Sequence, residues 1–125
     1  MSKGARTAAW AAAVIVFCSA ASAQDTAEGE RQFQRNCGVC HVVSEDGPAR
    51  AGPNLHGIVG RPAASEDGFP YSAAMSASGL VWDAATLDAY ITNSQALVPG
   101  ANMSVRVRDE AQRAAIIDYL ETAGQ

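Results

Sequence analysis

A pentapeptide from Cys37 to His41 carries the residue types with the clearest chemistry in this 125-residue sequence, because it reads Cys-Gly-Val-Cys-His. Each thiol at this spacing can add to a vinyl group of haem, and the adjacent histidine is then placed to ligate the iron. The alternatives are a disulfide, half of a zinc site and a thioredoxin-like redox pair. Zinc would need a second Cys or His pair, and the redox motif would need a βαβ context, and the sequence shows neither. The pentapeptide therefore favours covalent haem attachment.

The first 23 residues have the pattern of an export signal. Lys3 and Arg6 precede an uncharged apolar run from Ala8 to Cys18, and a small-residue cleavage sequence ends at Ala23. The apolar run is shorter than the ~20 residues that a membrane span needs, which argues against an uncleaved anchor. We therefore predict a signal peptide over residues 1–23, cleavage after Ala23 and a periplasmic protein.

The predicted mature chain, residues 24–125, is long enough for one domain of 102 residues and no more. It contains seven arginines, no lysine and thirteen carboxylates, which gives a formal net charge of −6. Nucleic-acid binding is excluded as a function class, because the phosphate backbone requires a basic footprint. Its two cysteines both lie in the pentapeptide, so a covalently bound haem would replace the disulfides that staple many small exported domains.

Four segments of the mature chain have helical sequence signals, and none alternates with the period-two pattern of a strand. The segments are residues 25–36, 72–78, 83–93 and 109–121. Asp25, Asp83 and Asp109 are N-cap candidates, with Glu28 as a capping-box partner for Asp25. The long stretches between the helices are rich in glycine and proline, so they need a ligand to pack against. The pattern predicts an all-α domain with long loops.

These residues together resemble the small class I cytochromes c, the electron carriers of mitochondria and photosynthetic bacteria. The likeness covers Gly29 to Leu120, nearly the whole mature chain. It rests on the following motifs in order: Gly29 with Phe33, the Cys37–His41 pentapeptide, Gly52-Pro53-Asn54-Leu55-His56-Gly57, Gly60-Arg61, Gly68-Phe69-Pro70-Tyr71, Trp82, Tyr90 with Asn93, Pro99-Gly100-Ala101-Asn102-Met103, and Ile116 to Leu120. The resemblance implies a class I cytochrome c fold of about four short helices and long loops around one covalently bound haem c.

The resemblance also implies a role for each candidate site residue. Cys37 and Cys40 would form the thioethers, and His41 and Met103 would be the axial ligands of the haem iron. The Pro53 carbonyl would accept from the second ring nitrogen of His41 and fix its tautomer. The remaining cofactor-binding candidates are the expected propionate donors and one member of a polar network beside the haem: Arg61, Tyr71, Trp82 and Tyr90.

The chain departs from the family pattern in three ways. Met75 and Ala101 stand where the family often has polar residues that join Tyr90 in a water-holding network, so we expect a thinner network here. The lysines that many members display around the haem edge are absent from residues 24–125. The usual docking partners of the family are therefore in doubt.

The resemblance implies a soluble, monomeric, non-enzymatic one-electron carrier of the periplasm. Its redox partners would come from a cytochrome bc complex, a terminal oxidase, a reaction centre or a periplasmic dehydrogenase. We expect neither nucleic-acid binding nor stable membrane insertion of the mature chain. The alternative is a haem-based sensor or gas-binding protein with an open sixth position, and binding of Met103 to the iron distinguishes the two.

Overall fold

The computed structural model describes residue 1 and residues 21–125, with only the backbone described for residues 21–24. The basic residues and the apolar run of the predicted export signal therefore lie outside the described residues. Within the part that is described, no helix is both long and apolar enough to cross a membrane. The predicted cleavage after Ala23 stays a prediction.

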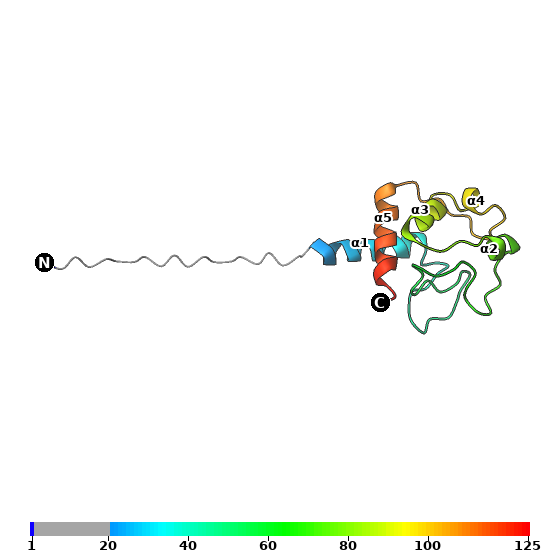
Figure 1. The fold of residues 1–125 in the computed structure, drawn as a ribbon, viewed down its shortest axis with the longest axis horizontal. Helices are drawn as coiled ribbons and strands as arrows, with labels where there is room; N and C mark the ends of the chain where they lie inside the picture. Colours follow the sequence, from blue (N-terminus) through cyan, green and yellow to red (C-terminus); the bar gives the residue numbers. More distant parts are fainter. Residues whose placement is uncertain (2–20) are drawn as a thin grey trace.

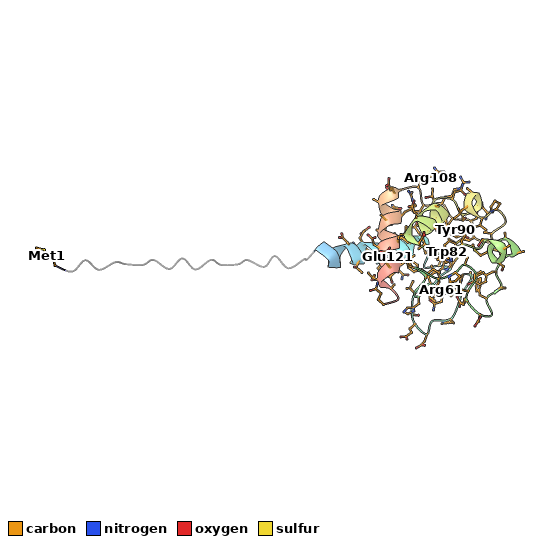
Figure 2. All side chains as sticks on the ribbon, viewed as in Figure 1. Met1, Arg61, Trp82, Tyr90, Arg108 and Glu121 are labelled. Carbon is orange, nitrogen blue, oxygen red and sulfur yellow. The ribbon has the colours of Figure 1, made fainter. Side chains whose placement is uncertain are left out.

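The described residues form five helices and no strand. The helices are α1 (Ala21–Asn36), α2 (Ala73–Ala77), α3 (Ala84–Thr92), α4 (Ser94–Leu97) and α5 (Glu110–Thr122). Figure 1 shows that α1 crosses α5, that α3 and α4 lie on one side of this crossing, and that the loops between α1 and α2 gather below them. Trp82 and Tyr90 lie inside the domain, whereas Arg108 and Glu121 lie on its outside (Figure 2). The predicted all-α class is confirmed.

Two predictions about the helices were wrong. The first helix begins at Ala21 rather than after Asp25, because alanine, serine and glutamine continue the helix through the expected cap. Glu28 is accordingly no capping partner, and its carboxylate accepts hydrogen bonds from Arg31 at 2.6 Å and Gln32 at 2.7 Å. The single-turn helix α4 was not predicted, since four residues are too few to show a helical period.

The other helix starts follow from capping chemistry. The side chains of Ser72, Asp83 and Asp109 each accept a hydrogen bond from the backbone N–H three residues later, at the starts of α2, α3 and α5. Such bonds satisfy donors that the first turn of a helix leaves without partners. The predicted starts of these three helices are confirmed.

The crossing of α1 and α5 depends on the absence of a side chain at Gly29. A Cβ atom there would meet the backbone carbonyl of Ala115 and would lie 2.8 Å from Cβ of Tyr119. Phe33, one turn further along α1, is only 1% exposed, and its ring centroid lies 5.5 Å from that of Tyr119. The close approach of the two helices holds the end of α1 against the core.

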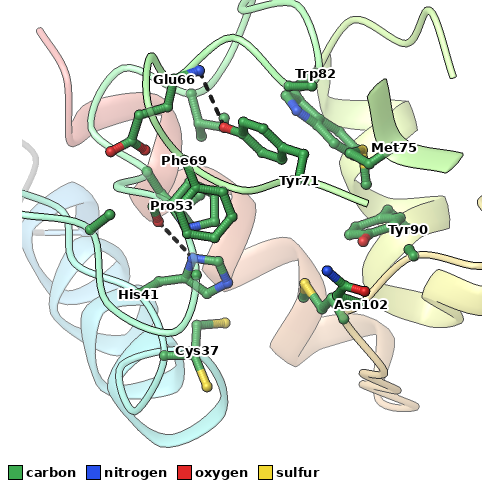
Figure 3. Close-up of a pocket in the computed structure, with 18 of the residues that line it drawn as sticks. Cys37, His41, Pro53, Glu66, Phe69, Tyr71, Met75, Trp82, Tyr90 and Asn102 are labelled. Atoms are coloured by element: carbon green, nitrogen blue, oxygen red, sulfur yellow. Dashed lines mark hydrogen bonds between the residues drawn. The ribbon is translucent and has the colours of Figure 1, made fainter. Parts of the chain in front are cut away.

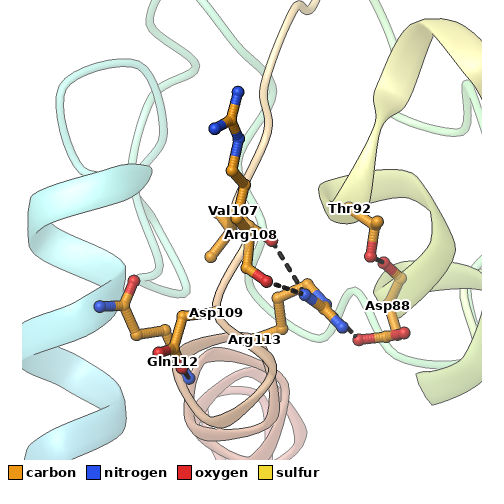
Figure 4. A network of polar contacts seen from close by, with 7 residues as sticks. All are labelled: Asp88, Thr92, Val107, Arg108, Asp109, Gln112 and Arg113. Carbon is orange, nitrogen blue, oxygen red and sulfur yellow. Dashed lines mark hydrogen bonds and ion pairs between the residues drawn. The ribbon is translucent and has the colours of Figure 1, made fainter.

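A network of polar contacts joins α5 to α3 and to the segment that precedes α5 (Figure 4). Arg113 donates from Nε to Asp88 at 2.7 Å, and from Nη1 to the carbonyls of Val107 and Arg108 at 3.0 Å each. The Arg113 side chain is only 12% exposed, so little solvent screens these charge-assisted bonds. The network fixes the downstream end of the loop that carries Met103, and nothing in the sequence pattern predicted it.

We expect Gly29→Ala to lower the free energy of unfolding by about 2 kcal/mol, because the new methyl group meets the backbone of α5 rather than a movable side chain. This loss outweighs the gain of about 1 kcal/mol in helix propensity. Urea unfolding followed by circular dichroism measures the change. The control is Glu30→Ala at the exposed neighbouring position, which should change stability by less than about 0.5 kcal/mol. A Gly29→Ala variant as stable as the original chain would contradict this account of the crossing.

Candidate haem-binding site

One cavity of about 950 Å³ opens between the helices and the loops. This volume is at the upper end of the range for sites that enclose small molecules and cofactors. All nine predicted site residues line it: Cys37, Cys40, His41, Pro53, Arg61, Tyr71, Trp82, Tyr90 and Met103. Figure 3 shows Cys37 and His41 on one side of the cavity and Asn102, the residue before Met103, on the other. The fold therefore brings several separate stretches of the chain to one place.

The two thiols sit in a tight turn at the end of α1. The backbone N–H groups of Cys40 and His41 both donate to the carbonyl of Cys37, at 3.0 and 2.9 Å. Cys37 is buried and Cys40 is exposed, and neither forms a disulfide. Burial, followed by the nearby Cys40, raises the pKa of Cys37 to about 11, so this group stays a protonated thiol at neutral pH. A protonated thiol is a poor metal ligand and a poor redox nucleophile.

The alternatives to haem attachment find no support in the described residues. They contain no cluster of three or more His, Cys, Asp or Glu side chains that could hold a metal ion. Their regular structure is helical apart from one isolated bridge between Pro62 and Val81, so no βαβ unit surrounds the cysteines. Zinc binding requires such a cluster and thioredoxin-like chemistry requires a βαβ unit, and the described residues contain neither.

The imidazole of His41 is held in one orientation. Its Nδ1 lies 2.8 Å from the carbonyl oxygen of Pro53, so the proton sits on Nδ1 and the lone pair remains on Nε2. Burial lowers the pKa of His41, while the Pro53 carbonyl and the charge of Glu66 oppose this shift. The loop passes directly against the ring, because a Cβ at Gly52 would lie 2.6 Å from Nδ1 and 2.8 Å from Nε2. His41 therefore presents a neutral nitrogen ligand to the cavity.

The polar lining residues are donors in a mostly apolar cavity. The rings of Trp82 and Tyr90 lie with centroids 5.0 Å apart and planes tilted by 54°, and no described residue accepts a hydrogen bond from the indole N–H or the Tyr90 hydroxyl. The Tyr71 hydroxyl accepts from the backbone N–H of Glu66 at 3.2 Å, which leaves its own proton to donate. Burial also raises the pKa of Tyr90, so its hydroxyl stays a donor. These donors are suited to bind an anionic group of a ligand or a water molecule at the edge of a ligand.

Arg61 does more than the sequence analysis expected. Its Nη1 donates to the carbonyl of His56 at 2.9 Å and to that of Asn54 at 3.3 Å. The guanidinium therefore braces the loop that passes beneath His41, in addition to lining the cavity. His56 takes part through its backbone, and its side chain does not line the cavity that the described residues enclose.

The segment that carries Met103 is held by two side chains that the sequence analysis missed. The Met103 carbonyl accepts from Ser94 Oγ at 2.9 Å and from Gln95 Nε2 at 2.7 Å. Ser94 Oγ also accepts from the N–H of Val105 at 3.1 Å, and Ser94 is fully buried. In the sequence Ser94 and Gln95 are only two adjacent polar residues, and nothing in their spacing indicates a partner.

Met75 and Ala101 are buried in the cavity wall, as their place in the family pattern suggested. The Met75 side chain lies beside Tyr90 and Trp82 (Figure 3). Both residues are apolar, so this side of the cavity has fewer hydrogen-bonding groups than the family pattern offers.

Comparison with known proteins decides the family. The family model described as Cytochrome c matches residues 26–124. The chain belongs to the cytochrome c family. It is 40% identical over 121 residues to cytochrome c2 of Rhodomicrobium vannielii, with 96% of each chain covered. It is 41% identical over 99 residues to cytochrome c2 of Rhodopila globiformis, covering 78% of this chain and 92% of that protein, and 36% identical to cytochrome c of Chlamydomonas reinhardtii, covering 82% and 93%.

Family membership confirms the class I cytochrome c fold and the cofactor that the pentapeptide predicted. The cofactor is one covalent haem c, and Cys37, Cys40 and His41 supply its Cys-x-x-Cys-His attachment motif. The residues present fit this group, because the thiols, the Nε2 lone pair and the donors of the cavity wall all face one apolar space of suitable volume.

Proposed function

We propose that this chain is a one-electron carrier of the periplasm, with His41 and Met103 as the axial ligands of its haem iron. The observation that carries this proposal is the placement of both residues in the wall of one cavity, with Cys37 and Cys40 beside His41. Each thiol would add across one vinyl double bond, with sulfur bonding one carbon and the proton going to the other, so attachment would need no external oxidant. When bound, the haem supplies the ferric–ferrous couple.

The two ligands tune that couple in opposite ways. The His41 imidazole is a basic donor that the Pro53 carbonyl strengthens. The Met103 thioether is soft and neutral, so it favours the reduced iron and raises the potential relative to two histidines. Ser94 and Gln95 hold the Met103 backbone, which keeps the thioether in place when the charge on the iron changes. A ligand that stays bound in both states suits electron transfer.

Arg61, Tyr71 and Trp82 are proposed to hold the propionates, since buried carboxylates need hydrogen-bond donors. All three residues line the same cavity. Tyr71 and Trp82 have donor groups with no described acceptor, and Arg61 has Nη2 in addition to the atoms that brace the loop. Tyr90 lies on the Met75 side, where we propose that it is the main polar group beside the haem.

A bond-making function is not supported by the residues near Met103. The residues adjacent to Met103 in the sequence that line the cavity are Ala101, Asn102, Ser104 and Val105. None of these has a side chain that serves as a general acid or base, which a peroxidase-like site would need. We therefore propose that the chain is not an enzyme. A sensor or gas-binding function would require an open sixth position, which the test of Met103 below addresses.

We propose that residues 1–23 are an export signal and that the mature domain is residues 24–125. The basic start, the apolar run and the small-residue sequence ending at Ala23 support this proposal. Export also supplies the compartment in which the attachment chemistry of Cys37 and Cys40 takes place in bacteria. Cleavage after Ala23 would shorten α1 by three residues and leave its crossing with α5 intact.

The partners we propose are redox proteins rather than nucleic acid or membrane. The mature chain has a formal net charge of −6, and ion pairs with Glu28 and Asp88 neutralise two of its seven arginines, Arg31 and Arg113. Long-range attraction therefore favours a basic docking surface. We propose that the chain is a monomer and that its partner is a cytochrome bc complex, an oxidase, a reaction centre or a dehydrogenase. The net charge of the chain is complementary to such a partner when the partner's docking surface is basic.

Export predicts a defined product in a bacterium that carries a haem-attachment apparatus. The periplasmic protein should have the intact mass of residues 24–125 plus one haem, and Cys37→Ala or Cys40→Ala should each weaken attachment because one thioether is lost. Mass spectrometry of the purified protein measures both. Protein that retains Cys18, or haem that is extracted from the original chain by acidified solvent, would contradict the proposal.

The net charge predicts the sign of the salt effect on electron transfer. With an acidic redox protein the second-order rate should rise as salt goes from ~10 to ~200 mM, because screening weakens repulsion. With a basic partner the rate should fall over the same range. Stopped-flow mixing measures both rates, and an uncharged small reductant is the control, with a rate that salt leaves unchanged. A steep fall with the acidic partner would show that a local basic patch, rather than net charge, directs docking.

Ligation by Met103 predicts a low-spin, six-coordinate iron with a weak far-red sulfur-to-iron band in the ferric protein. Met103→Ala should abolish this band, lower the potential and open the iron to small ligands, because the thioether is lost. Met75→Ala and His56→Ala are the matched controls and should both keep the band. Absorption spectroscopy and redox titration give these results. Loss of the band in Met75→Ala together with its retention in Met103→Ala would overturn the ligand assignment.

A further inference from the structure

The peptide group between Pro53 and Asn54 is hydrogen-bonded at both of its ends. Its carbonyl oxygen accepts from His41 Nδ1 at 2.8 Å, and its N–H donates to Glu66 Oε2 at 2.7 Å. His41 and Asn54 are each 8% exposed, so both bonds lie mainly in the protein interior. Figure 3 shows Glu66 above Pro53 and His41, with the three residues on the same side of the cavity. The Glu66 carboxylate and the His41 imidazole are thus hydrogen-bonded to opposite ends of one peptide group.

A peptide group is a conjugated unit, so charge at one end affects the other. A carboxylate that accepts from the N–H draws the amide proton and increases the electron density on the carbonyl oxygen. The carbonyl then becomes a stronger acceptor for the Nδ1–H of His41, as in hydrogen-bonded chains that polarise one another. A stronger bond at Nδ1 makes Nε2 a more basic ligand.

We propose that Glu66 is a positioning residue that raises the basicity of His41 through the Pro53–Asn54 peptide bond and so lowers the reduction potential of the haem. This arrangement replaces the direct carboxylate–histidine contact of many metal sites by one in which a backbone amide stands between the two groups. The proposal rests on the proposed ligation of the iron by His41. It assigns a role to a residue that the sequence motifs did not include.

Neighbouring hydrogen bonds hold the Pro53–Asn54 peptide group in place between Glu66 and His41; we call this hydrogen-bonded series the relay. Asn54 Nδ2 donates to the carbonyls of Ser44 and Gly47 at 2.7 and 2.8 Å, and Asn54 Oδ1 accepts from the N–H of His56 at 2.9 Å. Arg61 holds the carbonyl of Asn54 from the other side. The peptide group therefore cannot rotate away from His41 without breaking several bonds, and its N–H stays directed at Glu66.

Glu66 is itself positioned, and its effect reaches the ring. Its backbone N–H donates to the Tyr71 hydroxyl, which anchors the start of the side chain. The charge of Glu66 acts to raise the pKa of His41 against the lowering effect of burial. Asp67 provides the comparison, because it also lines the cavity and is exposed, and among the described residues its carboxylate accepts no hydrogen bond from the N–H of Asn54.

The test compares Glu66→Gln with Asp67→Asn in the haem-loaded protein. Both substitutions remove one negative charge, but only Glu66→Gln changes the group that accepts from Asn54, and its amide oxygen can still accept. The measurements are the midpoint potential by redox titration and the ferrous-state proton resonances of His41 Nδ1–H and the Asn54 amide. The far-red band of the ferric protein is recorded for each variant, so that Met103 ligation is followed separately.

We expect Glu66→Gln to raise the midpoint potential by more than Asp67→Asn does. It should also move both proton resonances upfield and speed deuterium exchange at His41 Nδ1, whereas Asp67→Asn should leave them in place. Equal potential shifts with an unmoved His41 resonance would show a through-space charge effect and overturn the relay. Glu66→Ala is included as a third variant. An unchanged potential in Glu66→Gln, with a loss of stability only in Glu66→Ala, would show that Glu66 only stabilises the fold and would also overturn the proposal. In either case an intact far-red band would leave the proposed ligation standing.

Discussion

A large internal cavity in a small chain is the constraint on which the rest of this structure depends. The space of about 950 Å³ lies at the centre of a domain whose long connections, residues 37–72 and 98–109, contain no helix. Loops of this length lose much conformational entropy on ordering, and an apolar void gives nothing in return unless a ligand fills it. Covalent attachment through Cys37 and Cys40 resolves this problem, because the haem cannot dissociate and its faces complete the core. The cofactor is therefore a structural element as well as the redox centre.

The helices position the attachment turn in addition to contributing residues such as Tyr90 and Ile116 to the cavity wall. α1 ends at Asn36, directly before the first thioether cysteine, and its crossing with α5 at Gly29 sets the position of that end. α5 is in turn tied to α3 and to the loop after Met103 by Arg113. The two sides of the cavity are thus linked through α5. A displacement at the helix crossing would be transmitted to both proposed axial ligands, which gives the crossing a functional as well as a stabilising role.

The two sides of the cavity differ in polarity, and this difference bears on the potential. The His41 side is rich in directed hydrogen bonds, from the Pro53 carbonyl through Asn54 to Glu66 and Arg61. The Tyr90 side is lined by Met75 and Ala101, which add no hydrogen-bonding side chain. Polar groups near the histidine stabilise the oxidised iron, whereas a dry, apolar surrounding disfavours its extra positive charge. Under the proposed ligation by His41 and Met103, the potential of this protein reflects a balance between the hydrogen-bonded His41 side and the apolar residues on the Tyr90 side.

The sequence by itself determined the cofactor, the family and most helix starts, because each depends on local chemistry. The cofactor follows from two thiols and an imidazole at fixed spacing. The helix starts follow from N-cap side chains that accept a hydrogen bond from the backbone N–H three residues later. It also predicted which nine residues gather at the site, three of them from the pentapeptide and six through the family pattern, and their roles remain proposals. The sequence did not predict the start of α1, because residues with helix propensity continue through the expected cap at Asp25. It also did not predict α4, because four residues are too few to show a helical period. Only the tertiary structure decided which long-range partners meet. Glu66 reaches the Asn54 amide, Arg113 reaches Asp88, and Ser94 and Gln95 reach the Met103 carbonyl across stretches that have no repeating pattern. Such contacts depend on how the loops fold around the cavity, and no local spacing encodes them.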